Sequence, residues 1–276
     1  MKTKAFVLCL ILALLPFTIM AEVIEGNGKL VTKELSIHPF DAIRIDMSVT
    51  NNNGNWKKLF KQVSQTAKVN FSYQATGKTS LRITIDENIY PSLTVKVDDG
   101  QLLIKTKEGT QIRPTRFDIV GTSERLKKAD LSGNTTLSIN SDLRGEQFTA
   151  NVSTGASLKS ENALTFVDCD IDASTGCEVE LKQLNCDNLS ASASTGCDVK
   201  LGGKADIAHL AASTGSGIKA SNLTVTKAQC DSSTGSSISI HAVKTLNASA
   251  SLGSEIYYSG DPATNISTSL GGSVHK

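Results

Sequence analysis

The sequence predicts an all-β protein whose C-terminal half is a single-stranded parallel β-helix, in which one strand-and-turn coil follows another. Three observations support this fold class. A Ser-x-Gly tripeptide recurs from Gly133 to Gly271, and successive glycines are 22, 21, 20, 19, 20, 18 and 18 residues apart. Apolar residues recur at fixed distances from each glycine, and no repeat contains a helical pattern of useful length. A period of about 20 residues, one coil per repeat, is typical of solenoids.

Each repeat places apolar residues on both sides of its glycine. Apolar and polar residues alternate there, as in Glu178–Leu181, which predicts short strands with one inward face. Leucine-rich repeats have a similar period, but their fixed Leu and Asn spacing is absent. The positions three residues after the glycine are Leu158, Val179, Val199, Ile218, Ile238, Ile256 and Val274. Those five residues before it are Ala150, Ile171, Ala191, Leu210, Cys230, Ala248 and Ile266.

The tripeptide itself is interpreted as the corner of each coil, because glycine adopts backbone angles that other residues avoid. The corner glycines are Gly133, Gly155, Gly176, Gly196, Gly215, Gly235, Gly253 and Gly271. Stacked coils lie about 4.8 Å apart, so the preceding threonines form a candidate outward hydroxyl row. This row consists of Thr154, Thr175, Thr195, Thr214 and Thr234. An ice-binding surface is an alternative interpretation, although such surfaces usually need two parallel rows.

Ahead of the repeats, the sequence predicts two further segments. Residues 1–21 are a signal peptide, with a positive start, an apolar run and a small residue, Ala21, at the cleavage point. Residues 22–129 form an N-terminal β-rich domain, and residues 130–276 form the β-helix. A hairpin turns at Asp98–Gln101. One short amphipathic helix, Trp56–Val63, is expected to pack on the sheet or plug a solenoid end, with membrane contact as the alternative.

Composition excludes several classes of function. Loss of Lys2 and Lys4 with the leader changes the formal net charge from +1 to −1, so no basic field attracts nucleic acid. Aromatic residues are sparse, which argues against a sugar-stacking cleft. The five cysteines of the mature chain match no zinc pattern. Cys177 and Cys197 both follow a corner glycine and should stack on adjacent coils, as small buried fillers or as a disulfide.

The repeats contain few candidates for metal-binding or catalytic residues. Asp168, Asp170 and Asp172 share one strand face and are the candidate metal ligands. They are nearly 7 Å apart from one to the next, so an acidic surface stripe is the simpler interpretation. The corner serines with His209 or His241 as base suggest a nucleophile, but turn formation explains the serines more simply. No catalytic residue and no cofactor is predicted.

Stacking of the coils also predicts charge pairs. Glu180 and Lys200 should share a register and pair across coils, while Glu178 and Asp198 stack as like charges. Surface pairs of this kind stabilise a fold by at most about 1 kcal/mol. They are therefore expected to help set the register of the coils and to have no function.

Several stretches resemble one known family. They are Gly26–Thr32, Phe40–Ile43, Asp86–Asn88, Val97–Leu102 and Ala129–Gly133, followed by the Ser-x-Gly repeats in the same order. Together they resemble the putative auto-transporter adhesin, head GIN domain family of exported bacterial proteins. The resemblance implies a right-handed β-helix similar to pectin-lyase-like folds, no established catalytic residues and a suspected adhesive role. The Gly-Ile-Asn tripeptide that names the domain is missing here, and only Gly217–Lys219 comes near it.

The sequence therefore predicts an exported, non-enzymatic β-solenoid that acts as an adhesin or binding module. It is expected in the periplasm, on the outer surface or outside the cell, with an unknown glycan or protein ligand and no transmembrane segment after cleavage. A carbohydrate-active, pectin-lyase-like enzyme is the alternative. The last coil leaves an open strand edge, from which we expect homo-oligomerisation through a solenoid end or cover by a neighbouring segment.

Overall fold

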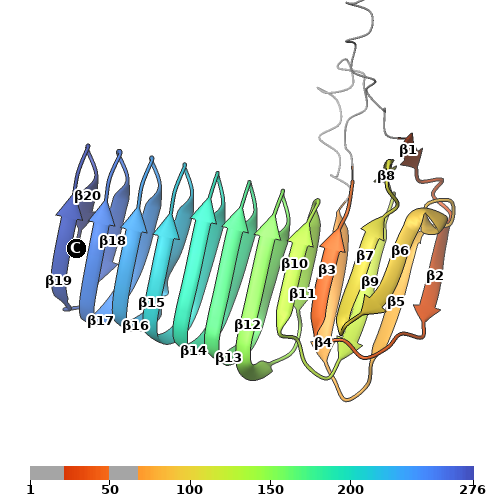
Figure 1. Ribbon diagram of the computed structural model, residues 1–276, viewed down its shortest axis with the longest axis horizontal. Coiled ribbons are helices and arrows are strands. Elements are labelled where there is room, and N and C mark those ends of the chain that lie inside the picture. The colour runs from red at the N-terminus through yellow and green to blue at the C-terminus, as the bar shows by residue number, and fades with distance from the viewer. Residues whose placement is uncertain (1–21, 50–67) are drawn as a thin grey trace, which may run out of the picture.

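A computed structural model describes residues 22–49 and 68–276, and it is an all-β solenoid of about seven turns. The strands lie side by side along one axis, from an N-terminal end that contains β1, β2 and β6 to the last coil at the C-terminus (Figure 1). The predicted signal peptide and the predicted helix at Trp56–Val63 lie outside the described residues.

The chain forms twenty strands and one short 3-10 helix within the described residues. The N-terminal elements are β1 (Glu22–Glu25), β2 (Leu30–Leu35), β3 (Ala42–Asp46), β4 (Val69–Ala75), β5 (Ser80–Asp86), η1 (Tyr90–Ser92), β6 (Leu93–Asp98), β7 (Gln101–Thr106), β8 (Thr110–Arg113) and β9 (Phe117–Ser123). The repeats contain β10 (Lys128–Ser132), β11 (Thr135–Ile139), β12 (Leu143–Ser153), β13 (Ser157–Ser174), β14 (Glu178–Ser194), β15 (Asp198–Ala212), β16 (Gly217–Ser232), β17 (Ser237–Ala250), β18 (Glu255–Ser259), β19 (Ala263–Thr268) and β20 (Ser273–His275).

Each middle coil is one long strand that bends, rather than the separate short strands that the alternation predicts. β13 to β17 each run from one turn to the next and pair in parallel with their neighbours, with a register shift at the bend. Ladder pairing resumes directly after the shift, and β13 runs through the bend as one strand. At the bend of β15, Gly203 has φ +120°, and a Cβ there would lie 2.1 Å from the carbonyl oxygen of Leu184. Only glycine fits this position.

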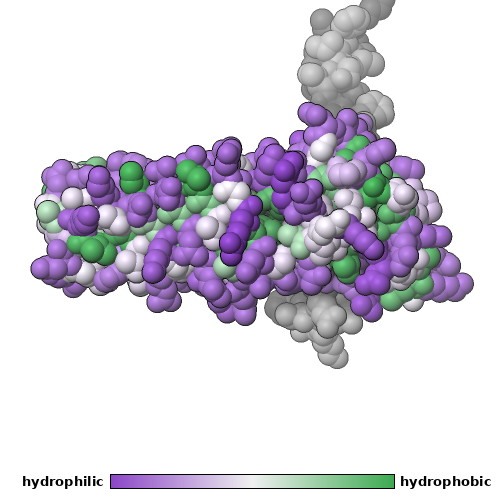
Figure 2. Space-filling view, turned by 90° about the horizontal axis from the view of Figure 1, so that it is seen from below, coloured by the Kyte–Doolittle hydropathy of each residue, from purple (hydrophilic) through white to green (hydrophobic). Residues whose placement is uncertain are grey.

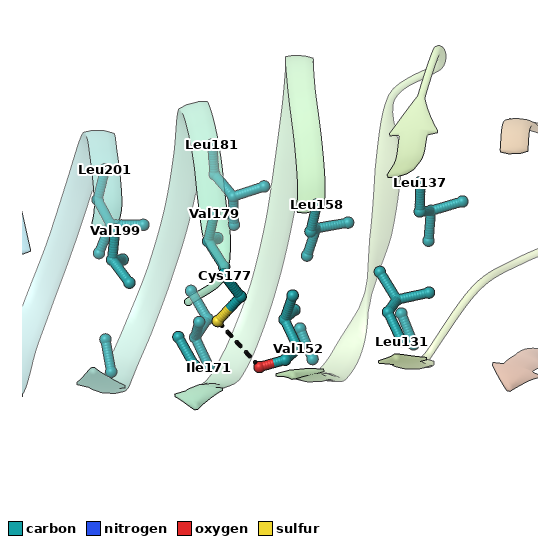
Figure 3. Packing of buried hydrophobic residues seen from close by; sticks show 14 of the residues in the cluster. Leu131, Leu137, Val152, Leu158, Ile171, Cys177, Val179, Leu181, Val199 and Leu201 are labelled. Atoms are coloured by element: carbon teal, nitrogen blue, oxygen red, sulfur yellow. Dashed lines mark hydrogen bonds between the residues drawn. The ribbon is translucent and has the colours of Figure 1, made fainter. Parts of the chain in front are cut away.

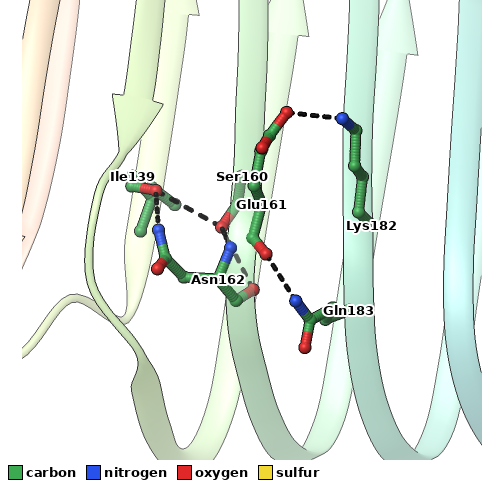
Figure 4. Close-up of polar contacts among 6 residues, drawn as sticks. All are labelled: Ile139, Ser160, Glu161, Asn162, Lys182 and Gln183. Atoms are coloured by element: carbon green, nitrogen blue, oxygen red, sulfur yellow. Dashed lines mark hydrogen bonds and ion pairs between the residues drawn. The ribbon is translucent and has the colours of Figure 1, made fainter.

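Polar side chains form hydrogen bonds at the bend. In the bend of β13, the Ser160 and Asn162 side chains donate hydrogen bonds to the carbonyl oxygen of Ile139 at 3.4 and 3.1 Å (Figure 4). One coil further on, Lys182 pairs with Glu161, and the Gln183 amide donates to the Glu161 carbonyl at 2.7 Å. These contacts satisfy polar groups where the register of the ladder shifts.

The interior is a set of apolar ladders, and it confirms the inward positions predicted around each glycine. Leu158, Val179 and Val199 are fully buried one above another (Figure 3). The exception is the last coil, where Ile266 is 45 % exposed although it continues the ladder of Ala248. Among residues 22–49 and 68–276 no further coil stacks on it, and this ladder position is therefore exposed in the last coil.

The coils of the repeats continue into the N-terminal strands without a gap in hydrogen bonding. β10 pairs in parallel with β12 on one side and with β3 on the other, and β11 does the same with β13 and β4. β7 and β9 form a further coil beneath β3 and β4. β5 and β6 then pair antiparallel with β9 and β7, and β2 pairs antiparallel with β5, so that these three strands cover the N-terminal end of the stack. The predicted hairpin is confirmed, since Asp98 pairs with Gln101 at the turn between β6 and β7.

Two short motifs of the N-terminal region lie against each other. The loop Gly26–Gly28 packs on Asp86–Asn88 at the end of β5, and Asn88 donates its side-chain amide to the Glu25 carbonyl at 2.7 Å. The carboxylate of Asp86 is fully buried and accepts hydrogen bonds from the Gly28 amide at 2.8 Å and from Thr115. A Cβ at Gly26 would lie 2.5 Å from this carboxylate. Close approach therefore requires glycine at position 26.

Candidate binding surface

The turn between successive coils has two consecutive residues in the left-handed region. In the five Ser-Thr-Gly copies the threonine has φ between 50° and 64°, and the glycine follows with φ between 65° and 73°. The serine carbonyl accepts an i+3 hydrogen bond in the copy at Ser153, where the Ala156 amide lies 3.1 Å away. Two positive φ values define a type I′ turn. A left-handed conformation is costly for a β-branched residue such as threonine.

The first turn uses these two positions in a different order from the other turns. Strand pairing aligns Leu131 with Val152, so Gly133 occupies the threonine position and Asn134 the glycine position. The assignment of Gly133 as an equivalent of Gly155 is therefore wrong by one residue. Glycine and asparagine both tolerate positive φ, so either order completes the turn.

The threonine row lies on the outside of the turns. Thr154, Thr175, Thr195, Thr214 and Thr234 are all exposed, and their hydroxyls form no hydrogen bond with the described residues. The last two turns have Leu252 and Leu270 instead, which are 52 % and 76 % exposed. Because the position accepts leucine in the left-handed conformation as well, its side chain is not required to complete the turn.

A second column of hydroxyls precedes the threonines by one residue. It belongs to what we call the serine face, the outward side of the strand segments before each turn. A shallow hollow of about 260 Å³ lies on this face over β14 to β17. Its polar lining residues are Ser192, Ser194, Ser213, Asp231, Ser232, Ser233, Ser249 and Ser251, with Ala193, Ala211 and Ala212 between them. Small side chains leave room there, and hydroxyls and one carboxylate surround it.

The three candidate metal ligands also lie on the serine face. Each accepts a hydrogen bond from a neutral side chain on an adjacent coil: Asp168 from Asn188 at 2.8 Å, Asp170 from Gln147 at 3.4 Å and Asp172 from Ser192 at 2.8 Å. Among the described residues, no group of three or more His, Cys, Asp or Glu side chains could hold a metal ion. The arrangement is a solvated acidic stripe with amide and hydroxyl partners.

The strand segments after each turn carry a ladder of ion pairs. Lys159 and Lys200 contact Glu178 at 2.8 and 3.1 Å, and Lys200 and Lys219 contact Asp198 at 3.6 and 3.1 Å. The stacking of Glu178 on Asp198 is confirmed. The shared register of Glu180 and Lys200 is confirmed as well. Lys200 nevertheless forms its ion pairs with Glu178 and Asp198, because two stacked carboxylates attract a cation more strongly than one does. The hydrogen bonds of Lys159 and Lys200 lower the pKa of Glu178 despite its partial burial.

Neither histidine forms the nucleophile arrangement considered from the sequence. His241 Nδ1 lies 2.9 Å from Ser259 Oγ, a serine of the bend rather than of a turn. His209 is exposed on the serine face and has no hydrogen-bond partner among the described residues. A general base needs a nucleophile within reach and a group that orients it.

Two surface features were not predicted from the sequence. A groove of about 510 Å³ crosses the N-terminal strands and includes Arg82, Arg116 and Asp118. Near the C-terminus, the rings of Tyr257 and His275 stack with their centroids 5.1 Å apart. Antiparallel pairing of β5 with β9 brings the groove residues together, and no repeat in the sequence signals it. Stacking of the last two coils could have indicated the second feature, since Tyr257 and His275 both follow a glycine by four residues.

The face seen in Figure 2 is largely hydrophilic, with apolar residues lying among the hydrophilic ones. The described part of the chain contains no helix that is long and apolar enough to cross a membrane. Fold and surface together define a β-solenoid with flat, hydroxyl-rich faces. A family model described as putative auto-transporter adhesin, head GIN domain, matches residues 59–262. The chain belongs to this family, as its motifs predict.

Solved structures of three relatives have the same fold. A putative lipid binding protein from Parabacteroides distasonis is 25 % identical, with a TM-score of 0.80 over 92 % of this chain and 99 % of that one. A putative adhesin from Parabacteroides merdae is 24 % identical with a TM-score of 0.78, and one from Parabacteroides distasonis is 20 % identical with the same score. Both cover the same shares of the two chains. None of the curated proteins matches the sequence.

Proposed function

We propose that this protein is an exported, non-enzymatic binding module that holds a glycan or protein ligand on its serine face. The observation that carries the proposal is the hollow over β14 to β17, where hydroxyls from four adjacent coils and the Asp231 carboxylate converge. Membership of a family described as adhesins supports the same function. The module acts in the periplasm, on the outer surface or outside the cell, after removal of residues 1–21.

The serine face suits ligands that present many hydrogen-bonding groups. Its hydroxyls both donate and accept, and its carboxylates accept. Asp168, Asp170 and Asp172 have no cationic partner within hydrogen-bond distance among the described residues, so their acceptor capacity is only partly used. A flat row of such groups fits an extended, hydroxylated chain better than a small apolar molecule, which usually needs an enclosed apolar pocket.

Ligand arrays test this proposal directly. The mature protein is applied to glycan and matrix-protein arrays, together with the variants Ser213→Arg and Ser233→Arg, which fill the hollow. Ser239→Arg is the matched control, because Ser239 is also half-buried but lies on β17, outside the hollow. We expect the two hollow variants to lose binding at least tenfold and the control to keep it. Equal binding by all four proteins would exclude the serine face.

The enzyme alternative predicts a different result. A polysaccharide lyase or hydrolase should release unsaturated products or new reducing ends from a panel of acidic polysaccharides. Turnover that is lost in Asp170→Ala would replace our proposal by the enzyme. Lipid vesicles are included on the arrays because one relative is described as a putative lipid binding protein. Vesicle binding that survives both hollow variants would favour a lipid ligand elsewhere on the surface.

The proposal also includes the architecture expected of the family. Residues 22–129 and 130–276 act as an N-terminal part and a right-handed β-helix, and two copies associate through the open C-terminal end. The edge strand β19 is exposed along its whole length and contains no charged residue, whereas edge strand β2 contains Lys33 and Glu34. Charges on edge strands oppose pairing with other chains. Sedimentation of the mature protein should show a dimer, and Ile266→Lys should make it monomeric.

A further inference from the structure

Two cysteines meet inside the turn region of the solenoid. Cys177 and Cys197 follow the glycines of successive turns, and their Sγ atoms lie 3.0 Å apart. Their side chains are 4 % and 2 % exposed, and both are free thiols. This is the contact between small buried fillers that the sequence predicts, but the two sulfur atoms are closer than ordinary packing requires.

The position after the glycine does not otherwise require sulfur. In the coils that follow it holds Ser216, Ser236 and Ser254, and the Ser236 hydroxyl donates to the Ala212 carbonyl at 2.8 Å. The Cys177 thiol forms the equivalent contact, since its Sγ lies 3.1 Å from the Val152 carbonyl oxygen (Figure 3). Serine would therefore satisfy this part of the turn equally well. Cysteine at two successive positions adds only the chemistry of the sulfur pair.

The other three cysteines have different neighbours. Cys169 and Cys186 face the interior at other ladder positions, where strand pairing places Leu189 and Phe166 beside them, and Cys230 lies beside Leu210. Among the described residues, Cys177 and Cys197 are the one pair of cysteines joined at hydrogen-bond distance, although Cys169 and Cys186 are near enough to interact electrostatically. These three residues are thus internal controls for any thiol chemistry.

The backbone geometry is suitable for a covalent bond. Adjacent parallel strands lie about 4.8 Å apart, within the 4.4–6.8 Å range of Cα separations that disulfides span. The two sulfurs lie 3.0 Å apart and need to approach by only about 1 Å to reach the bonding distance of about 2.05 Å. The resulting bridge would close a loop of 20 residues, one coil of the solenoid.

We propose that Cys177 and Cys197 form a disulfide that joins two adjacent coils when the chain folds in an oxidising compartment. The oxidant is a disulfide-containing molecule, such as oxidised glutathione or a thiol oxidase. One cysteine thiolate attacks the oxidant to give a mixed disulfide, and the second displaces the reduced oxidant. The two thiols lose two protons and two electrons, and the oxidant gains them as two thiols. The proposal rests on the proposed export of the protein.

Burial determines when this reaction takes place. Removal from water and, after it, the hydrogen bond with Cys197 together raise the pKa of Cys177 to about 12. Thiolate is therefore scarce in the folded protein at neutral pH, and exchange needs the thiolate. The bond forms while the coil is still open during folding, and the closed coil then shields it from reductants.

Alkylation of unfolded protein tests the proposal. The mature chain, residues 22–276, is refolded in a buffer of oxidised and reduced glutathione, denatured, alkylated with iodoacetamide and analysed by mass spectrometry, with and without prior reduction. We expect three alkylated cysteines before reduction and five after it, with peptide mapping that links Cys177 to Cys197. Five alkylated cysteines in both samples, or a link to Cys169, Cys186 or Cys230, would overturn the proposal.

Two variants separate the bridge from a packing effect. Cys177→Ser with Cys197→Ser should fold, because serine occupies the same position in the next three coils. Refolding with dithiothreitol in place of the glutathione buffer should lower the melting temperature of the wild type and of Cys230→Ala, and leave that of the double variant unchanged. The alkylation result stands without this variant if it fails to fold. Refolding takes place in vitro, so a missing disulfide would not bear on export or ligand binding.

Discussion

Replacement of Asp86 by asparagine should destabilise the N-terminal end of the solenoid. The Asp86 carboxylate is fully buried and accepts hydrogen bonds from the Gly28 amide, the Thr115 amide and the Thr115 hydroxyl at 2.7 to 2.8 Å. Asparagine keeps one acceptor oxygen but places a donor NH₂ against the donors that faced the other oxygen. Hydrogen bonds to a charged group stabilise by ~1.5–3 kcal/mol each, and a buried unpaired donor adds to the loss.

Together these terms predict a loss of about 3 kcal/mol for Asp86→Asn. For a chain of this size that corresponds to a fall in melting temperature of roughly 6–12 °C, measured by differential scanning calorimetry. Asp98→Asn is the matched control. Asp98 also has a lowered pKa, from its hydrogen bond with Lys96, but its side chain is exposed and only a small change is expected. An unchanged melting temperature for Asp86→Asn would refute the reasoning.

The pH dependence of stability provides a second check on Asp86. Burial acts to raise the pKa of its carboxyl, but the hydrogen bonds from Thr115 and Gly28 outweigh it and lower the pKa. The unfolded chain, with an aspartate pKa of about 3.9, therefore binds a proton before the folded chain does. The stabilisation is fully present above the unfolded pKa and is lost as the pH falls through the folded one. Asp86→Asn should lack this part of the acid transition.

Three further substitutions test the turn, the bend and the ion-pair ladder. Thr195→Asn should raise stability by about 0.5–1 kcal/mol, because asparagine tolerates φ +54° better than threonine does. Thr149→Asn lies on a regular strand and should not raise stability. Calorimetry of the two variants compares them. Gly203→Ala should lower the free energy of unfolding, measured in urea, by ~3 kcal/mol or more, because the new Cβ meets a backbone carbonyl. Gly196→Ala should lower it by only about 1 kcal/mol, because its Cβ meets open space. Lys200→Ala should lower stability by less than about 1 kcal/mol, and the loss should shrink in high salt; a loss independent of salt would contradict an electrostatic origin.

The repeat region could be predicted from the sequence because each coil repeats the same local pattern. Alternation identifies the inward residues such as Val179 and Val199, and the glycine period identifies the turns. Alignment on glycine fails at Gly133, because a turn with two left-handed residues accepts glycine at either position. Only strand pairing reveals which of the two it occupies.

The N-terminal end could not be predicted in the same way. Its motifs Gly26–Gly28 and Asp86–Asn88 are about 60 residues apart, and no periodicity links them. Their contact depends on antiparallel pairing of β2 with β5, which follows from tertiary packing. The serine face could be predicted from the sequence only in part. Its columns follow from the repeat, whereas the hollow depends on which coils carry alanine and serine at neighbouring positions.

The stacking of identical turns also makes the solenoid a molecular ruler. Equivalent side chains recur about every 4.8 Å along the axis, so the number of coils sets how many copies of a contact the surface can offer at once. Since each coil contacts mainly its two neighbours, duplication or loss of one coil changes valency and reach while the chemistry of every contact is kept. Weak contacts that engage simultaneously then add to a firm attachment, and its strength is tuned by length alone.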